Sequence, residues 1–221
     1  MDKIHKILDN LKNGIPQALS RYNDGEVQGI IQPGCVVARG DQEVPKELSD
    51  ALRRSIQHQQ ENYWVGIPCN KCNTKKWYNH AIKLVDPNYE YLTKAVVTTN
   101  RNWKLFTSKV TECIGDKSVV WVSGNNQKID NLPFKVHCYL KVPKKNAWRA
   151  YDEVDSALEL LPSGCVVFFS CGPMSRVLAC EWFKKKPDSN YLDVGSAFDP
   201  VTKNLWHACH KGTLRKCEGC N

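Results

Sequence analysis

The sequence predicts a single α/β domain: a Rossmann-like, doubly wound, mainly parallel sheet with helices on both faces. Two short apolar runs support this prediction, SVVWVSGNN at 118–126 and GCVVFFSCGP at 164–173. Both are rich in β-branched and aromatic residues and lack polar alternation, which is typical of strands buried on both faces of a parallel sheet. Apolar residues at helical spacing flank the second run. Helix and strand therefore alternate along the C-terminal half.

The other elements follow from the same two patterns. Residues 1–14 predict an amphipathic helix, because Ile4, Ile7, Leu8 and Leu11 recur at helical spacing. Pro173 stands at a favourable first position for the helix after the second apolar run. Further helices are expected within 45–60, 102–115 and 151–161, and further strands at 63–68 and 190–196.

Length and composition set the limits of the prediction. A chain of 221 residues suits one domain spanning 1–221, and residues 204–221 add a Cys/His-rich tail. No apolar run approaches the roughly 18 residues of a membrane span, and no secretory signal is present, so we expect a cytoplasmic protein without a membrane span. Most of the eleven cysteines lie in apolar runs, which indicates small buried side chains in a reducing compartment.

The formal net charge of +8 favours an anionic partner, such as a nucleotide sugar, a nucleic acid or an acidic surface. Lysine and arginine are spread along the chain rather than concentrated in one block, so a dedicated nucleic-acid arm is not expected.

Small polar residues follow three of the expected strands. They are Ser123, Gly124 and Asn125 after the first, Ser170, Cys171 and Gly172 after the second, and Asp193, Ser196 and Asp199 after the third. Because ligands of open α/β sheets bind beyond the carboxyl ends of the strands, these residues are candidates for binding a diphosphate at a helix start. Ordinary turns are the alternative. Neither a Walker loop nor a dinucleotide fingerprint is present, so ATPase and dehydrogenase functions have no motif support.

Paired acids near the N-terminus form a second candidate site. Asp24 and Glu26 lie one residue apart after Arg21 and Asn23. A D-x-E on a turn can offer two carboxylates to a divalent cation, and an arginine beside them can bind phosphate or fix one carboxylate. The alternatives are an ordinary turn, or a Glu26 that caps the following helix.

The segment LSRYNDGEVQGI resembles the ARFGDGE segment of glycosyltransferases with the GT-D fold. VVFFSCGPMSRVLACEWF and NYLDVGSAFDP resemble, in the same order, that family's S-x-G-P and D-x-G units, so the resemblance covers about residues 15–200. It departs from the family at Asn23, where glycine is usual, and at Ser196, where many members carry histidine. A histidine-dependent contact is therefore not carried over.

The resemblance implies a single-domain enzyme that moves a sugar from a nucleotide-diphosphate donor, with a UDP-sugar favoured, to a glycan or glycoprotein acceptor. Asp24 and Glu26 would bind Mn²⁺ or Mg²⁺ and the donor diphosphate, with Arg21 and Asn23 beside them. Asp193 and Asp199 are candidates for a catalytic base by location alone. Lys211 is a candidate for phosphate binding. Retention or inversion at the sugar stays open.

Two cysteine pairs have the spacing of zinc ligands. They are Cys69 with Cys72, and Cys217 with Cys220. Four such thiolates can form a closed structural zinc site that attaches the tail to the domain, and the alternative is free thiols or a redox pair. Two other functions stay open on these features. One is a zinc-stapled basic module that binds nucleic acid, and the other is a metal-dependent phosphoester hydrolase on the same scaffold.

Overall fold

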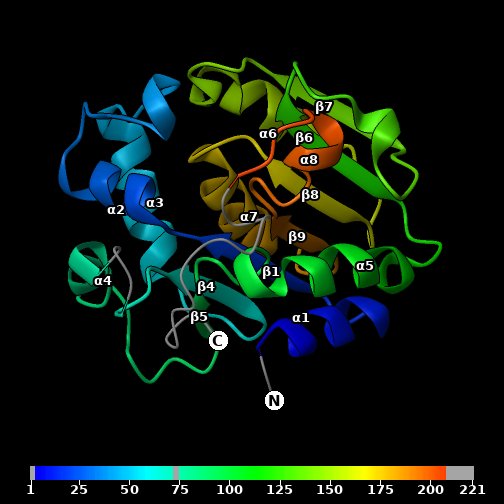
Figure 1. The fold of residues 1–221 in the computed structure, drawn as a ribbon, viewed down its shortest axis with the longest axis horizontal. Helices are drawn as coiled ribbons and strands as arrows, with labels where there is room; N and C mark the ends of the chain where they lie inside the picture. Colours follow the sequence, from blue (N-terminus) through cyan, green and yellow to red (C-terminus); the bar gives the residue numbers. More distant parts are fainter. Residues whose placement is uncertain (1–2, 72–74, 208–221) are drawn as a thin grey trace.

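The computed structural model describes residues 3–71 and 75–207. Seven parallel strands form one sheet in the order β5-β4-β1-β9-β8-β6-β7, with helices on both faces (Figure 1). The strands are β1 (Gln17–Arg21), β4 (Tyr63–Ile67), β5 (Leu92–Lys94), β6 (Val119–Gly124), β7 (Cys138–Val142), β8 (Val166–Ser170) and β9 (Asn190–Asp193). The predicted fold class is confirmed. A small antiparallel ribbon joins β2 (Val36–Val37) to β3 (Gln42–Glu43) outside this sheet.

The helices alternate with the strands as the sequence predicts. They are α1 (Lys3–Lys12), α2 (Asp24–Ile31), α3 (Lys46–Gln57), α4 (Lys75–Ala81), α5 (Trp103–Ile114), α6 (Tyr151–Glu159), α7 (Met174–Lys185) and α8 (Asp199–Thr202). Short 3₁₀ turns are η1 (Ala38–Gly40), η2 (Asn100–Asn102), η3 (Ile129–Asn131) and η4 (Ala147–Ala150). Within the described residues, no helix is long and apolar enough to cross a membrane.

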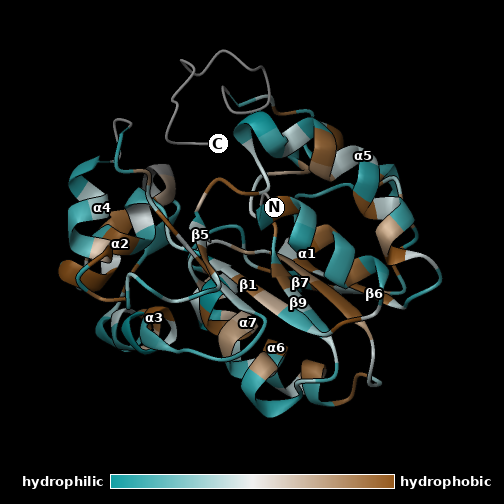
Figure 2. Cartoon of the chain, turned by 90° about the horizontal axis from the view of Figure 1, so that it is seen from below, coloured by the Kyte–Doolittle hydropathy of each residue, from teal (hydrophilic) through white to brown (hydrophobic). Residues whose placement is uncertain are grey.

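Alternate strand residues enter two separate cores, one on each face of the sheet. In β8, Val166 and Phe168 pack with α1 and α5, whereas Val167 and Phe169 pack with α2, α3, α6 and α7. All four side chains are fully buried. This two-sided burial explains the unbroken apolar runs of the sequence. Figure 2 shows that the helices around the sheet carry both hydrophilic and hydrophobic stretches.

The direction of the chain reverses beside β1. From β1 the chain continues to β4 and β5 on one side, then crosses to β6 and β7 and returns through β8 to β9, which pairs with β1. Such a reversal is a topological switch point, where open α/β sheets bind ligands beyond the carboxyl ends of the strands. The residues that end β1 and β9 are Arg21 and Asp193.

Candidate active site

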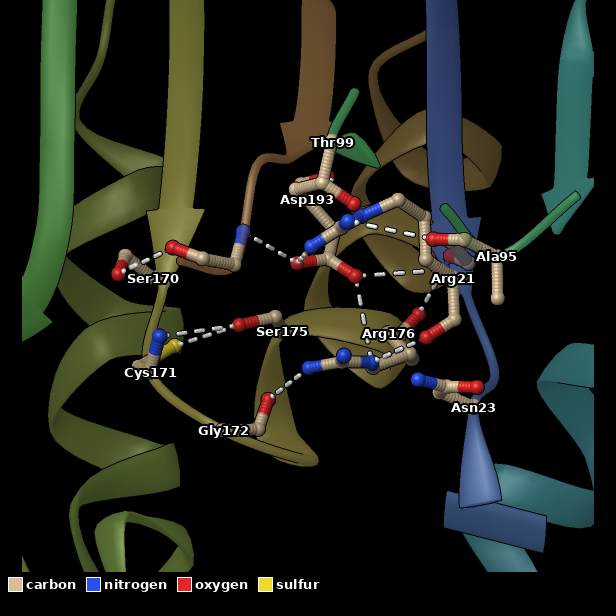
Figure 3. A network of polar contacts seen from close by, with 12 residues as sticks. Arg21, Asn23, Ala95, Thr99, Ser170, Cys171, Gly172, Ser175, Arg176 and Asp193 are labelled. Carbon is tan, nitrogen blue, oxygen red and sulfur yellow. Dashed lines mark hydrogen bonds and ion pairs between the residues drawn. The ribbon is translucent and has the colours of Figure 1, made fainter. Parts of the chain in front are cut away.

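A buried ion pair joins the ends of β1 and β9 (Figure 3). Arg21 Nη2 lies 3.4 Å from Asp193 Oδ1, and Arg21 Nε donates to the Asp193 carbonyl at 2.8 Å. Arg21 Nη1 donates to the Ala95 carbonyl at 3.2 Å, and the two ionised side chains are 7% and 0% exposed. All three guanidinium nitrogens of Arg21 therefore bind protein oxygens, which leaves little of this group for a phosphate.

Arg176, from the first turn of α7, connects this pair to two further segments. Its Nε donates to the Arg21 carbonyl at 2.8 Å and lies 3.2 Å from Asp193 Oδ2. Its Nη2 lies 3.2 Å from Glu26 Oε1, and its Nη1 donates to the Gly172 carbonyl. Burial lowers the pKa of Arg176, the Asp193 and Glu26 carboxylates raise it, and the net shift is upward. These two arginines and two carboxylates, named here the ion network, are mutually neutralised.

The two acids of the D-x-E sequence have different environments. Glu26 is buried, with Oε1 on Arg176 and Oε2 accepting the Asn23 backbone N–H at 3.0 Å, which caps α2. Asp24 is exposed at the first position of the same helix, and its carboxylate bonds to no other described residue. At 100° per residue these side chains leave the helix about 200° apart. The capping alternative for Glu26 is the arrangement observed, and metal binding stays a prediction.

The loop before α7 lies beside the start of α2, because Arg176 contacts both. Gly172 has a φ of +67°, a left-handed conformation that favours glycine. Cys171 is buried, and its N–H and sulfur both contact the Ser175 hydroxyl. Burial raises the pKa of the Cys171 thiol to about 12, so it is not a nucleophile at neutral pH. At the start of α7 the Ser175 and Arg176 N–H groups already donate to the Gly172 and Pro173 carbonyls. The N–H groups of Asp24 and Gly25 at the start of α2 have no acceptor among the described residues, which makes this helix start suitable for an anion.

A line of hydrogen bonds fixes the neighbouring strand ends. Trp121 Nε1 donates to Gln127, which donates to the Ser170 hydroxyl at 3.0 Å, and Ser170 donates to the Gly195 carbonyl at 2.8 Å. At Gly195 a Cβ atom would lie 1.9 Å from Arg21 Nη2, and the φ of +49° is left-handed. Only glycine therefore fits between the end of β9 and Arg21.

Five other predicted residues that the structure describes, Ser123, Gly124, Asn125, Ser196 and Asp199, do not contact the ion network. Ser123 is buried and bonds to the Gly124 carbonyl and Tyr139, and Asn125 lines a polar cavity of about 480 Å³ beyond β6. Ser196 is half-buried, with its carbonyl accepting from the Asp199 N–H. Asp199 is buried in a separate cluster, 2.9 Å from both Lys203 Nζ and His207 Nε2.

The zinc prediction is left untested. Cys69 is buried just beyond β4, whereas Cys72, Cys217 and Cys220, as well as Lys211, lie outside the described residues. Among residues 3–71 and 75–207, no group of three or more His, Cys, Asp or Glu side chains is placed to hold a metal ion.

Sequence reasoning missed Arg176, Gln127 and Gly195. Arg176 carries a usable signal, since it is a charged residue in the first turn of a helix that is buried on most sides. A charge in such a place needs a buried partner, which the acids after β1 and in β9 supply. The tight packing at Gly195 depends on the position of Arg21, 174 residues earlier, and no local pattern reveals it.

Comparisons with known proteins place the fold. No sequence family and no curated protein matches the chain. Three solved structures are similar. One is a selenomethionine-substituted structure of domain of unknown function 1792, with TM-score 0.68 and 18% identity over 88% of this chain and 77% of that one. Another carries the description that this domain has a distinct glycosyltransferase fold, with TM-score 0.66 and 17% identity over 87% and 76%.

The third is described as a new glycosyltransferase with this domain from Streptococcus sanguinis, with TM-score 0.68 and 17% identity over 88% of this chain and 80% of that one. At such low identity these likenesses establish the fold. The resemblance to GT-D fold glycosyltransferases is therefore confirmed for the architecture.

Proposed function

We propose that the protein is a glycosyltransferase that binds the diphosphate of a nucleotide-sugar donor at the carboxyl edge of β1, β9 and β8. One observation carries the proposal. The starts of α2 and α7 meet at the switch point, where Arg176 bridges Glu26 and Gly172 and the Asp24 carboxylate is unpaired among the described residues. Shared architecture with structures described as glycosyltransferases supports it.

The helix starts provide the electrostatics that sugar transfer needs. Negative charge builds on the leaving diphosphate as its bond to the sugar breaks, and aligned backbone N–H groups at helix N-termini stabilise such charge. Both helix starts are held rigidly by the ion network, so they need not reorganise during the reaction. This makes the network a scaffold for the catalytic groups.

The carboxylate of Asp24, unpaired among the described residues, supports the binding of a divalent cation in this site. Alone, its carboxylate would repel a diphosphate, whereas one carboxylate together with phosphate oxygens is an ordinary ligand set for Mg²⁺. Mn²⁺ or Mg²⁺ held by Asp24 and the donor would neutralise charge on the leaving group. Glu26 does not fit this role, because both of its oxygens are already in use. A UDP-sugar and a glycan or glycoprotein acceptor are the substrates that the sequence resemblance favours.

Thermal unfolding with UDP, GDP and their sugars, with and without Mn²⁺, tests the proposal. We expect at least one nucleotide sugar to raise the unfolding temperature in a Mn²⁺-dependent way. Asp24→Asn should remove the Mn²⁺ dependence and lower sugar transfer about a hundredfold, while it leaves the free energy of unfolding within about 0.5 kcal/mol.

Asp130→Asn is the matched control, because Asp130 is also exposed and has no bonded partner in the described part of the chain. It should change neither quantity. The absence of stabilisation by every nucleotide sugar, with and without Mn²⁺, would contradict the proposal. Turnover of a phosphodiester without a sugar acceptor would favour the hydrolase alternative instead.

A further inference from the structure

A cavity of about 330 Å³ lies at the carboxyl ends of β4 and β5. Most of its lining is apolar, with contributions from Ile67, Leu92, Val96 and Val97. Its volume is at the lower end of the range of small-molecule sites, which is about 300–1,000 Å³. Its volume therefore suits a nucleobase with its ribose rather than a complete nucleotide sugar.

Several polar groups in this cavity have no hydrogen-bond partner among the described residues. Thr93 is 8% exposed, yet its hydroxyl forms no hydrogen bond with another residue of the described chain. The same holds for the hydroxyl of Tyr78 and the ammonium group of Lys94. The Asn102 side-chain amide donates to the Val97 carbonyl, and its oxygen accepts no hydrogen bond from another described residue. Thr93 is buried and Tyr78 and Lys94 are half-buried, so their polar groups converge on one cavity with hydrogen-bonding capacity that a ligand could use.

The cavity lies at the same edge of the sheet as the ion network. Thr93 pairs in register with Gly66, and Gly66 pairs with Arg21. The carbonyl of Ala95, next to Lys94, accepts from Arg21 Nη1. Two strand spacings, about 10 Å, therefore separate the cavity from the end of β1, on the same edge of the sheet. A nucleoside in this cavity can extend its diphosphate to the helix starts.

We infer that this cavity binds the base and ribose of the donor, an inference that rests on the proposed function. A nucleobase has apolar faces and hydrogen-bonding edges, and the cavity offers an apolar lining with the Thr93 and Tyr78 hydroxyls and the Asn102 amide oxygen. Lys94 supplies positive charge on the side of the diphosphate. The donor then lies along the edge from β5 to α7, with its sugar at the starts of α2 and α7.

Isothermal titration of the full chain with UDP and GDP in Mn²⁺, and with uridine and guanosine, tests this assignment. Val96→Trp fills the cavity and should weaken the tighter-binding nucleotide more than tenfold. Thr93→Val removes one hydrogen bond and should weaken it about three- to tenfold. Lys94→Met should weaken the nucleotide but leave the affinity of its nucleoside unchanged.

Two substitutions serve as matched controls. Lys141→Met removes a lysine from the other cavity, and Val201→Trp enlarges an exposed side chain on α8. Each should change nucleotide affinity less than twofold. Unchanged affinity in both Val96→Trp and Thr93→Val would overturn the nucleoside assignment and leave the proposed function in place. Failure of UDP and GDP to bind the unaltered chain would overturn both.

Discussion

The ends of β1 and β9 and the ends of β4 and β5 lie at one edge of the same sheet, yet their polar groups are used in opposite ways. At the first, Arg21, Arg176, Glu26 and Asp193 are buried and satisfy one another. At the second, hydroxyl and ammonium groups line a cavity without partners in the described chain. Charged residues that a sequence suggests as catalytic can therefore have a structural role. Uncharged or isolated polar residues nearby, such as Thr93, can keep hydrogen-bonding groups available for a ligand.

The same contrast occurs within one turn of helix. Asp24 and Glu26 form the most specific motif of the sequence, and both were candidates for one metal site. Glu26 is committed to Arg176 and to the helix cap, whereas Asp24 is exposed without a partner among the described residues. The motif therefore combines a structural acid with an available one.

The largest effect is expected from removing one charge from the ion network. Arg176→Met leaves Glu26 and Asp193 buried without their shared cation, which should lower the free energy of unfolding by about 3–5 kcal/mol. The same chemical change in the cavity, Lys94→Met, should alter it by less than about 0.5 kcal/mol, because Lys94 has no bonded partner in the part of the chain described.

Urea unfolding at neutral pH measures both variants. Arg149→Met, at an exposed arginine in η4, controls for the loss of a guanidinium and should resemble Lys94→Met. Equal destabilisation by Arg176→Met and Lys94→Met would erase the distinction between the two regions.

A second test concerns the space beside Arg21. Gly195→Ala places a methyl group 1.9 Å from Arg21 Nη2 on a left-handed backbone, and should cost about 3 kcal/mol of unfolding free energy. Gly164→Ala is the matched control, because its φ of +77° is equally strained but its Cβ position is open. It should cost about 1 kcal/mol, measured in the same urea titration. A similar cost at both sites would mean that the Arg21 packing adds nothing.

These contrasts define what the sequence alone can reveal. The strands β6, β8 and β9 were predictable because burial on both faces leaves an unbroken apolar run, as in Val166–Phe169. The edge strand β7 was not predictable, since its side chains are mostly half-buried and its sequence mixes polar and apolar residues without a clear pattern. The strand β5 was not predictable either, because it has only three residues. Register and crossover order depend on contacts between distant segments.

The site divides in the same way. The convergence of the acids with the loop before α7 was predictable, because parallel strands end at one edge of a sheet. Which acid stays available was not, because that depends on Arg176, 150 residues after Glu26. Thr93 and Tyr78 carry no local motif at all. We infer their role from hydroxyl groups that lack partners in the described chain, a feature that only the three-dimensional structure reveals.

A third prediction concerns alkaline pH, where the free energy of unfolding should decrease because buried acidic groups are held protonated. Burial raises the pKa of the Cys171 thiol from 9.0 to about 12. Between these values the unfolded chain releases a proton that the folded chain keeps, so stability falls as pH rises, by at most about 1.4 kcal/mol per pH unit for this group. Tyr22 and Tyr63, whose pKa values burial also raises, act in the same direction.

Urea unfolding from pH 8 to 10.5 in reducing buffer, on the unaltered chain and on Cys171→Ala, isolates the thiol. The variant should lose stability less steeply as pH rises, whatever its stability at pH 8. Identical slopes would show that this thiol is not held protonated by the fold.

The smallest effect has the opposite sign. Thr93 is a buried residue that lines the cavity, and its hydroxyl has no partner in the described chain; Thr93→Val replaces this hydroxyl by a methyl group and should raise the free energy of unfolding by about 0.5 kcal/mol. Thr98→Val is the matched control, since Thr98 Oγ1 has no partner in the described chain either but is buried away from the cavity. Thermal unfolding without ligand should show a small gain for both variants.

Nucleotide affinity then separates the two threonines. Thr98→Val should bind UDP or GDP as the unaltered chain does, whereas Thr93→Val should bind more weakly while it is more stable. A group that lowers stability and raises affinity is what a binding site requires, because its hydrogen bond is completed only by the ligand. A Thr93→Val variant that is less stable than the unaltered chain would show instead that this hydroxyl has a structural role. The polar groups of the cavity would then be used as those of the ion network are, and the proposed difference between the two regions would be wrong.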